Sequence, residues 1–186
     1  MTAISNAKIL IIATNGFEQS ELEVPRDQMR ARGAEVHVAT LDGNPIKGWQ
    51  GKDWGREAAA DAKIADINSH DYDALVIPGG QINPDLLRVE PAVIDLVKDF
   101  HNEGKVIAAV CHGPWVLVEA GIVKGREVTS YHSIKTDVVN AGGNWVDEPV
   151  ACDKGIVTSR KPDDLNAFVA KIVEEVEEGQ HDRRAA

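Results

Sequence analysis

The sequence predicts an α/β protein in which helices cover both faces of a mostly parallel sheet. Three observations support this fold class. Short runs of apolar and β-branched residues recur along the chain, helical segments separate them, and glycine or proline punctuates most of the boundaries. Apolar runs without alternation are typical of strands buried on both faces of a parallel sheet. Such sheets bind ligands beyond the carboxyl ends of their strands.

The first β-α-β unit is predicted at the start of the chain. Residues 8–13, with the sequence KILIIA, form an apolar run that indicates a buried strand. Residues 18–32 predict a helix, because Gly33 follows them in the place of a C-cap. Residues 35–40 return to the pattern of a strand.

The later elements are predicted on the same grounds. Further strands are expected at residues 74–77, 106–110, 128–131, 150–152 and 156–158, the last two forming a hairpin around the turn 153–155. Helices are expected at residues 91–103, 114–120, 133–141 and 162–178. Pro91 and Pro114 suit the first turns of their helices, since proline has no N–H to leave unpaired there. Residues 41–71 are rich in glycine and predict a hairpin or a loop.

The length and composition are typical of one globular domain spanning residues 1–186. The chain is 43% hydrophobic and 27% charged, and its polar end, from about residue 179 to residue 186, is expected to fray. It carries 30 acidic and 20 basic residues, a formal charge of −10. This acidic balance, without a basic patch, argues against nucleic acid or an anionic membrane as a partner. No secretory signal and no spanning run is found, so we expect a cytoplasmic protein.

The cysteines and histidines do not show the spacing of a metal site. Cys111 and Cys152 are far apart and lack a CxxC motif, so neither a zinc site nor a disulfide framework is predicted. Four histidines are scattered without ligand spacing, namely His37, His70, His101 and His181. We therefore expect no metal and no cofactor.

Cys111 lies between a predicted strand and a predicted helix, in the stretch AAVCHGPW. Ala109 and Gly113 flank it at two residues on either side, as in the sharp nucleophile turn of hydrolases, where small neighbours let strand and helix pack closely. The N-terminus of the following helix favours the thiolate, which is the reactive form of cysteine. The alternative is that Cys111 only fills core volume, as buried cysteines often do.

Three segments that carry candidate catalytic or binding groups each follow a predicted strand. They are residues 16–21, Gly79-Gly80 and Cys111-His112. Because parallel strands end at one edge of their sheet, these segments are expected to converge there. His112 has the pKa range of a general base or acid, although the bend after Cys111 must turn it toward the sulfur.

Several motifs together resemble the PfpI-like family, in the ThiJ/PfpI branch of the class I glutamine amidotransferase-like superfamily. The resemblance rests on AVCHGPW, IPGG, NGFEQSELEVP, NAGGNW and KPDDLNAF, and it spans nearly the whole chain. It implies a flavodoxin-like three-layer α/β/α sandwich with a nucleophile elbow at Cys111, assembled as a homodimer or hexamer.

The resemblance also implies roles for two acids. Glu21 would contact Cys111 from the helix after the first strand, and it must hold its proton because two negative charges would otherwise meet in a poorly solvated pocket. Asp85 would orient His112 across a subunit boundary, although relatives more often carry glutamate there and the local spacing is one residue longer. Either acid could instead be a helix-start residue stabilised by the dipole.

The remaining site residues are predicted to bind and orient the substrate. The backbone N–H groups of Gly80 and His112 would form an oxyanion hole. Tyr131, His132 and Trp115 are expected to line the pocket, although each could instead belong to the core or the rim.

Three functions fit these residues. The first is a stress-response hydrolase that uses Cys111 on glyoxal-derived or methylglyoxal-derived adducts of small molecules, proteins or nucleotides, in the manner of a deglycase or glyoxalase. The second is an intracellular cysteine peptidase with the triad Cys111, His112 and Asp85. The third is a redox sensor or stress chaperone, in which Cys111 is oxidised and Glu21 stabilises the sulfinic acid.

Overall fold

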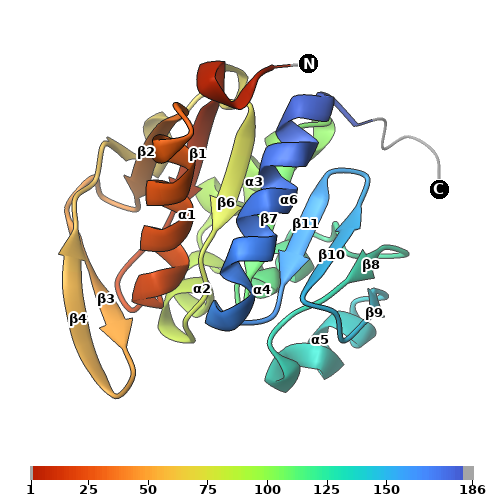
Figure 1. Cartoon of the computed structure of the whole chain (residues 1–186). Helices are drawn as coiled ribbons and strands as arrows, with labels where there is room; N and C mark the ends of the chain where they lie inside the picture. Colours follow the sequence, from red (N-terminus) through yellow and green to blue (C-terminus); the bar gives the residue numbers. More distant parts are fainter. Residues whose placement is uncertain (1, 182–186) are drawn as a thin grey trace.

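A seven-stranded sheet forms the centre of the computed structural model, which describes residues 2–181 (Figure 1). The strand order is β10-β11-β7-β6-β1-β2-β5. The strands are β1 (Lys8–Ile12), β2 (Glu35–Thr40), β5 (Ala62–Lys63), β6 (Ala74–Ile77), β7 (Val106–Val110), β10 (Val150–Asp153) and β11 (Ile156–Ser159). Every neighbouring pair is parallel except β10 and β11, so the predicted mostly parallel sheet is confirmed.

Helices pack on both faces of this sheet, which gives the three layers of the predicted sandwich. Two long helices, α1 (Gln19–Ala31) and α6 (Leu165–Glu178), lie side by side on one face (Figure 1). The opposite face is covered by α3 (Pro91–Asn102) and α4 (Pro114–Glu119). Two short helices complete the set, α2 (Ile82–Leu87) and α5 (Lys135–Asn140). Short 3-10 helices occur at Ile4–Asn6, Ile64–Asp66, Ser69–Asp71, His132–Ile134 and Pro162–Asp164.

Strand β1 shows why the central strands are apolar throughout. Ile9 and Ile11 join the core on the side of α1 and α6, whereas Leu10 and Ile12 join the core on the side of α3 and α4. Successive side chains of a strand point to opposite faces, so a strand covered on both faces needs apolar residues at every position.

Two small sheets lie outside the central one. Within residues 41–71, β3 (Ile46–Gln50) and β4 (Asp53–Ala58) form an antiparallel hairpin at the edge of the molecule beside α1 (Figure 1). The other pair is β8 (Glu127–Val128) and β9 (Asn144–Trp145), which are parallel.

The structure differs from the predicted elements in two places near the site. The strand expected at 128–131 ends at Val128, because Thr129 donates its N–H to Thr158 Oγ1 and Tyr131 donates its N–H to the Cys111 carbonyl. Residues 129–131 therefore run toward Cys111 instead of extending a ladder. Helix α2 was not predicted, since its six residues are too few to show helical periodicity.

The predicted frayed tail, from about residue 179, is described as far as His181. Residues 182–186 of the predicted frayed tail lie outside the described residues. His181, in contrast, donates its backbone N–H to the Gly104 carbonyl at 2.8 Å. None of the helices within residues 2–181 combines the length and apolar character that crossing a membrane requires.

Candidate active site

Cys111 occupies a sharp turn directly after β7. Its φ is 62°, in the left-handed region that residues with a side chain rarely adopt. The turn packs tightly on the sheet, since a Cβ on Gly113 would lie 2.7 Å from the Ile77 carbonyl oxygen. This geometry is the strained strand-to-helix elbow that the flanking small residues predict.

The three predicted segments meet in one cavity at the carboxyl ends of β1, β6 and β7. Its volume is about 400 Å³, which suits a small molecule. Glu21, Gly80, Cys111, His112 and Tyr131 all line it.

Glu21 is fully buried beside the Cys111 thiol. Its Oε2 accepts the Gly79 N–H at 2.8 Å, and its Oε1 is buried without a hydrogen-bond partner within residues 2–181. Burial, followed by the charge of Glu18, raises the pKa of Glu21 to about 8. At neutral pH Glu21 therefore holds its proton and can donate it in a hydrogen bond with the Cys111 side chain.

The protonation of Cys111 depends on competing influences. Burial raises the pKa of the thiol, and so does the Glu21 carboxylate, whereas the Gly80 and His112 backbone N–H groups lower it. The repulsion from Glu21 exists only when Glu21 is ionised. The sequence predicts a thiolate from the position of Cys111 at a helix N-terminus. That position is not sufficient, because Cys111 is only 7% exposed and burial disfavours the charged form.

His112 lies against the sulfur through its ring. Nδ1 is 3.1 Å from Cys111 Sγ, and Nε2 is 3.1 Å from Ser133 Oγ. Burial and the nearby His132 lower the pKa of His112, so its imidazole is neutral at pH 7. A neutral Nδ1 can accept the thiol proton while Nε2–H donates to Ser133. The Tyr131 ring stacks on the imidazole, with centroids 5.0 Å apart.

Two backbone N–H groups point toward the same sulfur. They belong to Gly80 and His112, and both lower the pKa of the Cys111 thiol by hydrogen bonding to it. Gly80 has a φ of 78°, and a Cβ there would lie 2.5 Å from the Gly16 carbonyl oxygen. Only glycine fits this position, so the Gly80 N–H can approach the Cys111 sulfur closely.

Comparison with known proteins identifies the family to which this chain belongs. The model of the DJ-1/PfpI family matches residues 7–175. The chain belongs to the DJ-1/PfpI family.

Relatives in the DJ-1/PfpI family match most of the chain. Deglycase PfpI of Pyrococcus furiosus is 37% identical over 166 residues, which are 89% of this chain and 97% of the relative. Protein/nucleic acid deglycase 2 of Escherichia coli is 40% identical over 163 residues, 87% of this chain and 92% of the relative. The crystal structure of Drosophila melanogaster DJ-1beta superposes with a TM-score of 0.83 at 31% identity, covering 96% of this chain and 95% of that one.

Asp85 does not reach the site within one chain. It lies exposed on α2, and the hydrogen bonds and ion pairs found among residues 2–181 do not join it to His112. Ser133 takes the place beside Nε2 instead. Any contact of Asp85 with a histidine would have to come from another subunit.

Two of the predicted pocket residues lie beside the cavity and do not line it. Trp115 donates its Nε1–H to Asp137 Oδ2 at 2.8 Å and packs against the His112 ring. It therefore contacts the His112 imidazole without lining the cavity. His132 lines a neighbouring hollow with Asp147 and Arg160.

Sequence reasoning missed several residues of this DJ-1/PfpI site. Asn83 is buried and holds the turn after β6, accepting the Thr14 N–H at 2.7 Å and donating to the Pro78 carbonyl at 2.9 Å. Trp49, from the hairpin, lines the cavity together with Glu18. For Trp49, the available signal was its place beside Trp54 in the glycine-rich stretch. The sequence did not predict where this stretch lies relative to the sheet.

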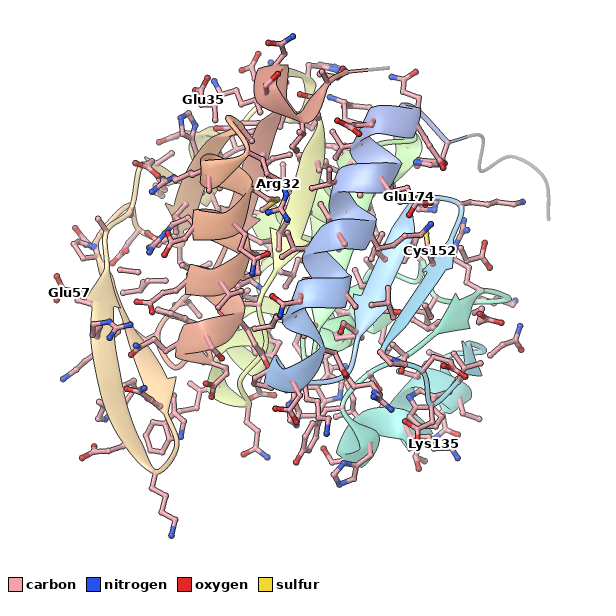
Figure 2. The ribbon with its side chains drawn as sticks, viewed as in Figure 1. Arg32, Glu35, Glu57, Lys135, Cys152 and Glu174 are labelled. Atoms are coloured by element: carbon pink, nitrogen blue, oxygen red, sulfur yellow. The ribbon has the colours of Figure 1, made fainter. Side chains whose placement is uncertain are left out.

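A second cluster of ionisable groups lies at the other end of the sheet. Glu175, Glu178 and His181 could offer ligand atoms that all lie within 4.8 Å of one another. However, Glu175 already pairs with Lys171 at 2.8 Å and with His181 at 3.3 Å, so its charge is balanced. Cys152, labelled in Figure 2 on the hairpin beside α6, adjoins this cluster and is separate from the cavity.

The buried proton of Glu21 predicts a pH dependence of stability. Between pH 4.5 and about 8 the unfolded chain releases this proton while the folded chain keeps it, so the free energy of unfolding falls as the pH rises. The full effect is about 5 kcal/mol, at about 1.4 kcal/mol per unit of pKa. Glu21→Gln removes this contribution, so urea unfolding at pH 5 and pH 8 should show a smaller fall for the variant than for the wild type. Equal falls in both proteins would show that Glu21 is ionised.

Proposed function

We propose that this protein is a cysteine-dependent hydrolase that removes glyoxal and methylglyoxal from adducts, with a role under dicarbonyl stress. The observation that carries the proposal is the thiol of Cys111 in a small cavity, 3.1 Å from a neutral imidazole and next to a protonated carboxyl group. The two relatives named deglycases support the same class of reaction.

The first step forms a bond between sulfur and carbon. The thiol proton moves to His112 Nδ1, and Sγ attacks the carbon of the adduct that derives from the aldehyde. The thiol or amine of the adduct leaves with a proton, which His112 can supply. Negative charge that develops on the substrate oxygen faces the Gly80 and His112 N–H groups.

The later steps convert the bound fragment into an acid. A hydrogen moves from the former aldehyde carbon to the neighbouring carbonyl carbon, which oxidises the first carbon to a thioester and reduces the second to an alcohol. Glu21 and His112 are the groups placed to move this proton. Water then cleaves the thioester and releases lactate from methylglyoxal or glycolate from glyoxal, so the reaction needs no external oxidant.

A peptidase is the second candidate, and it depends on assembly. Helix α2 and the residues just after it expose three apolar side chains near Asp85 in the chain, namely Ile82, Leu86 and Val89. We propose that a second copy of the chain covers this face in a homodimer or hexamer and brings Asp85 toward the partner's catalytic histidine. The geometry of one chain favours the deglycase, because that chemistry needs no residue from a partner.

Cys111→Ala should abolish the deglycase reaction, because no other thiol lines the cavity. We expect lactate formation from methylglyoxal and its thiol adducts to fall by at least 100-fold, measured by an enzymatic lactate assay. Cys152→Ala is the matched control and should keep wild-type activity. Lactate formation that survives Cys111→Ala would contradict the proposal, whereas peroxide-driven gain of mass at Cys111 without any lactate formation would favour a redox sensor.

His112→Ala should lower kcat by about 100-fold to 10,000-fold, the range for the loss of a general acid or base. Iodoacetamide labelling of Cys111 should persist in this variant, which would show that the elbow is still formed. Unchanged kcat would exclude His112 as the proton carrier.

Asp85→Asn separates the two candidate enzymes. If the deglycase proposal holds, the variant forms lactate at the wild-type rate, since Asp85 is exposed and does not line the cavity of its own chain. Hydrolysis of unfolded casein that is present in the wild type and lost in the variant would instead support the peptidase. Light scattering would show whether the assembly is unchanged.

A further inference from the structure

The cavity carries a single ionised carboxylate that has no cationic partner. Glu18 and Glu21 are the two acids in its lining, and no lysine or arginine is among the lining residues. Glu21 keeps its proton at neutral pH because burial raises its pKa to about 8. Glu18 is only half-buried. Partial burial raises its pKa, and the hydrogen bond that its Oε1 accepts from Ser20 Oγ at 3.3 Å opposes that rise by favouring the ionised form.

The charge of Glu18 is not balanced within residues 2–181. The ion pairs found there do not include Glu18, whereas Glu23, one turn further along α1, pairs with Arg56. A carboxylate left without a counter-charge at the wall of a substrate cavity attracts a cation from solution.

Trp49 stands next to Glu18 at the same wall. The two residues form a bridge between the start of α1 and the hairpin, in which Trp49 donates its backbone N–H to the Phe17 carbonyl at 2.7 Å. The indole Nε1–H donates to the Gly51 carbonyl at 3.1 Å, so the polar edge of the ring is satisfied within the hairpin. The cavity is thus lined by both an indole and a carboxylate from neighbouring backbone positions, and aromatic rings and carboxylates are the groups that bind organic cations.

We propose that Glu18 and Trp49 form a cation subsite, which selects substrates that carry a positive charge at the end away from the reacting carbon. The subsite itself follows from the cavity, whereas its use in selecting adducts rests on the proposed deglycase function. The preferred substrates are dicarbonyl adducts of thiols or amines that bear an ammonium or guanidinium group. Adducts with a carboxylate at that end are disfavoured, because Glu18 repels them.

Glu18 also influences Glu21, and the test must separate the two effects. The negative charge of Glu18 raises the pKa of Glu21, so its removal alters the proton next to Cys111. That change acts on every substrate alike. If Glu18→Gln allowed Glu21 to ionise, the new charge would favour cationic substrates, so a loss of the preference for cationic over anionic substrates reports the direct effect of Glu18 on the substrate charge.

The substrate test uses three methylglyoxal hemithioacetals that differ in charge. They are made from thiocholine, which is cationic, N-acetylcysteamine, which is neutral, and 3-mercaptopropionate, which is anionic. We expect kcat/KM of the wild type to fall in that order, by about tenfold from the cation to the anion. Glu18→Gln should bring the three values together, and Trp49→Leu should reduce the advantage of the cation.

The matched control is Glu57→Gln. Glu57 is an exposed carboxylate of the same hairpin, and Figure 2 shows it at the outer edge of β4, away from the cavity. This variant removes the same charge and should keep the wild-type order of substrates. Equal kcat/KM values for the three substrates in the wild type, or an unchanged ratio in Glu18→Gln, would overturn the proposal.

A binding experiment tests the subsite without catalysis. Choline and 3,3-dimethylbutan-1-ol have the same shape and differ in charge, so their dissociation constants can be compared on the Cys111→Ala variant by tryptophan fluorescence and by NMR chemical shifts. We expect choline to bind at least fivefold more tightly, and Glu18→Gln in the same background to remove the difference. Equal binding of the two compounds would overturn the subsite. Tighter choline binding to this variant, combined with a wild-type protein that forms no lactate from any of the three hemithioacetals, would retain the subsite and reject the deglycase function.

Discussion

The left-handed backbone at Cys111 is the constraint on which the site depends. A residue with a side chain at a φ of 62° carries strain of about 1–3 kcal/mol, which the surrounding structure has to offset. Both backbone groups of Cys111 are held, since its N–H donates to the Ser159 carbonyl at 3.0 Å and its carbonyl accepts the Tyr131 N–H at 2.8 Å. Strand β11 and the segment after β8 thus fix the turn at Cys111. This turn brings the Cys111 sulfur and the His112 ring into contact.

Cys111, His112 and Glu21 can lie close together in this small cavity because, at rest, Glu21 and His112 carry no charge. Burial keeps the proton on Glu21 and leaves His112 neutral, so neither adds a full charge next to the thiol at rest. The backbone N–H groups of Gly80 and His112 supply partial positive charge without a cationic side chain. Protons can therefore pass among sulfur, imidazole and carboxyl group while the net charge of the buried site changes little.

The hairpin of β3 and β4 packs against the start of α1, where Glu18 and Glu21 line the cavity. Arg56 donates its backbone N–H to Gln19 Oε1 at 2.6 Å, and its guanidinium group pairs with Glu23. These contacts fix β4 on the helix that also carries Glu21, and they hold Trp49 at the cavity wall. Helix α1 therefore carries Glu21 beside Cys111 and also anchors the hairpin that brings Trp49 to the cavity.

The sequence by itself determined the parallel sheet, the elbow at Cys111 and the convergence of three segments at one sheet edge, because each follows from neighbouring residues and from the geometry of parallel strands. Only the tertiary structure decided that Ser133 adjoins His112, that Asp85 lies outside the site of its own chain, and that Trp49 lines the cavity. It also decided that burial keeps His112 neutral and raises the pKa of the Cys111 thiol, whereas the proton on Glu21 was already expected from its predicted contact with Cys111. These features arise from desolvation and from contacts between segments distant in the chain, and no local pattern of residues encodes either of them.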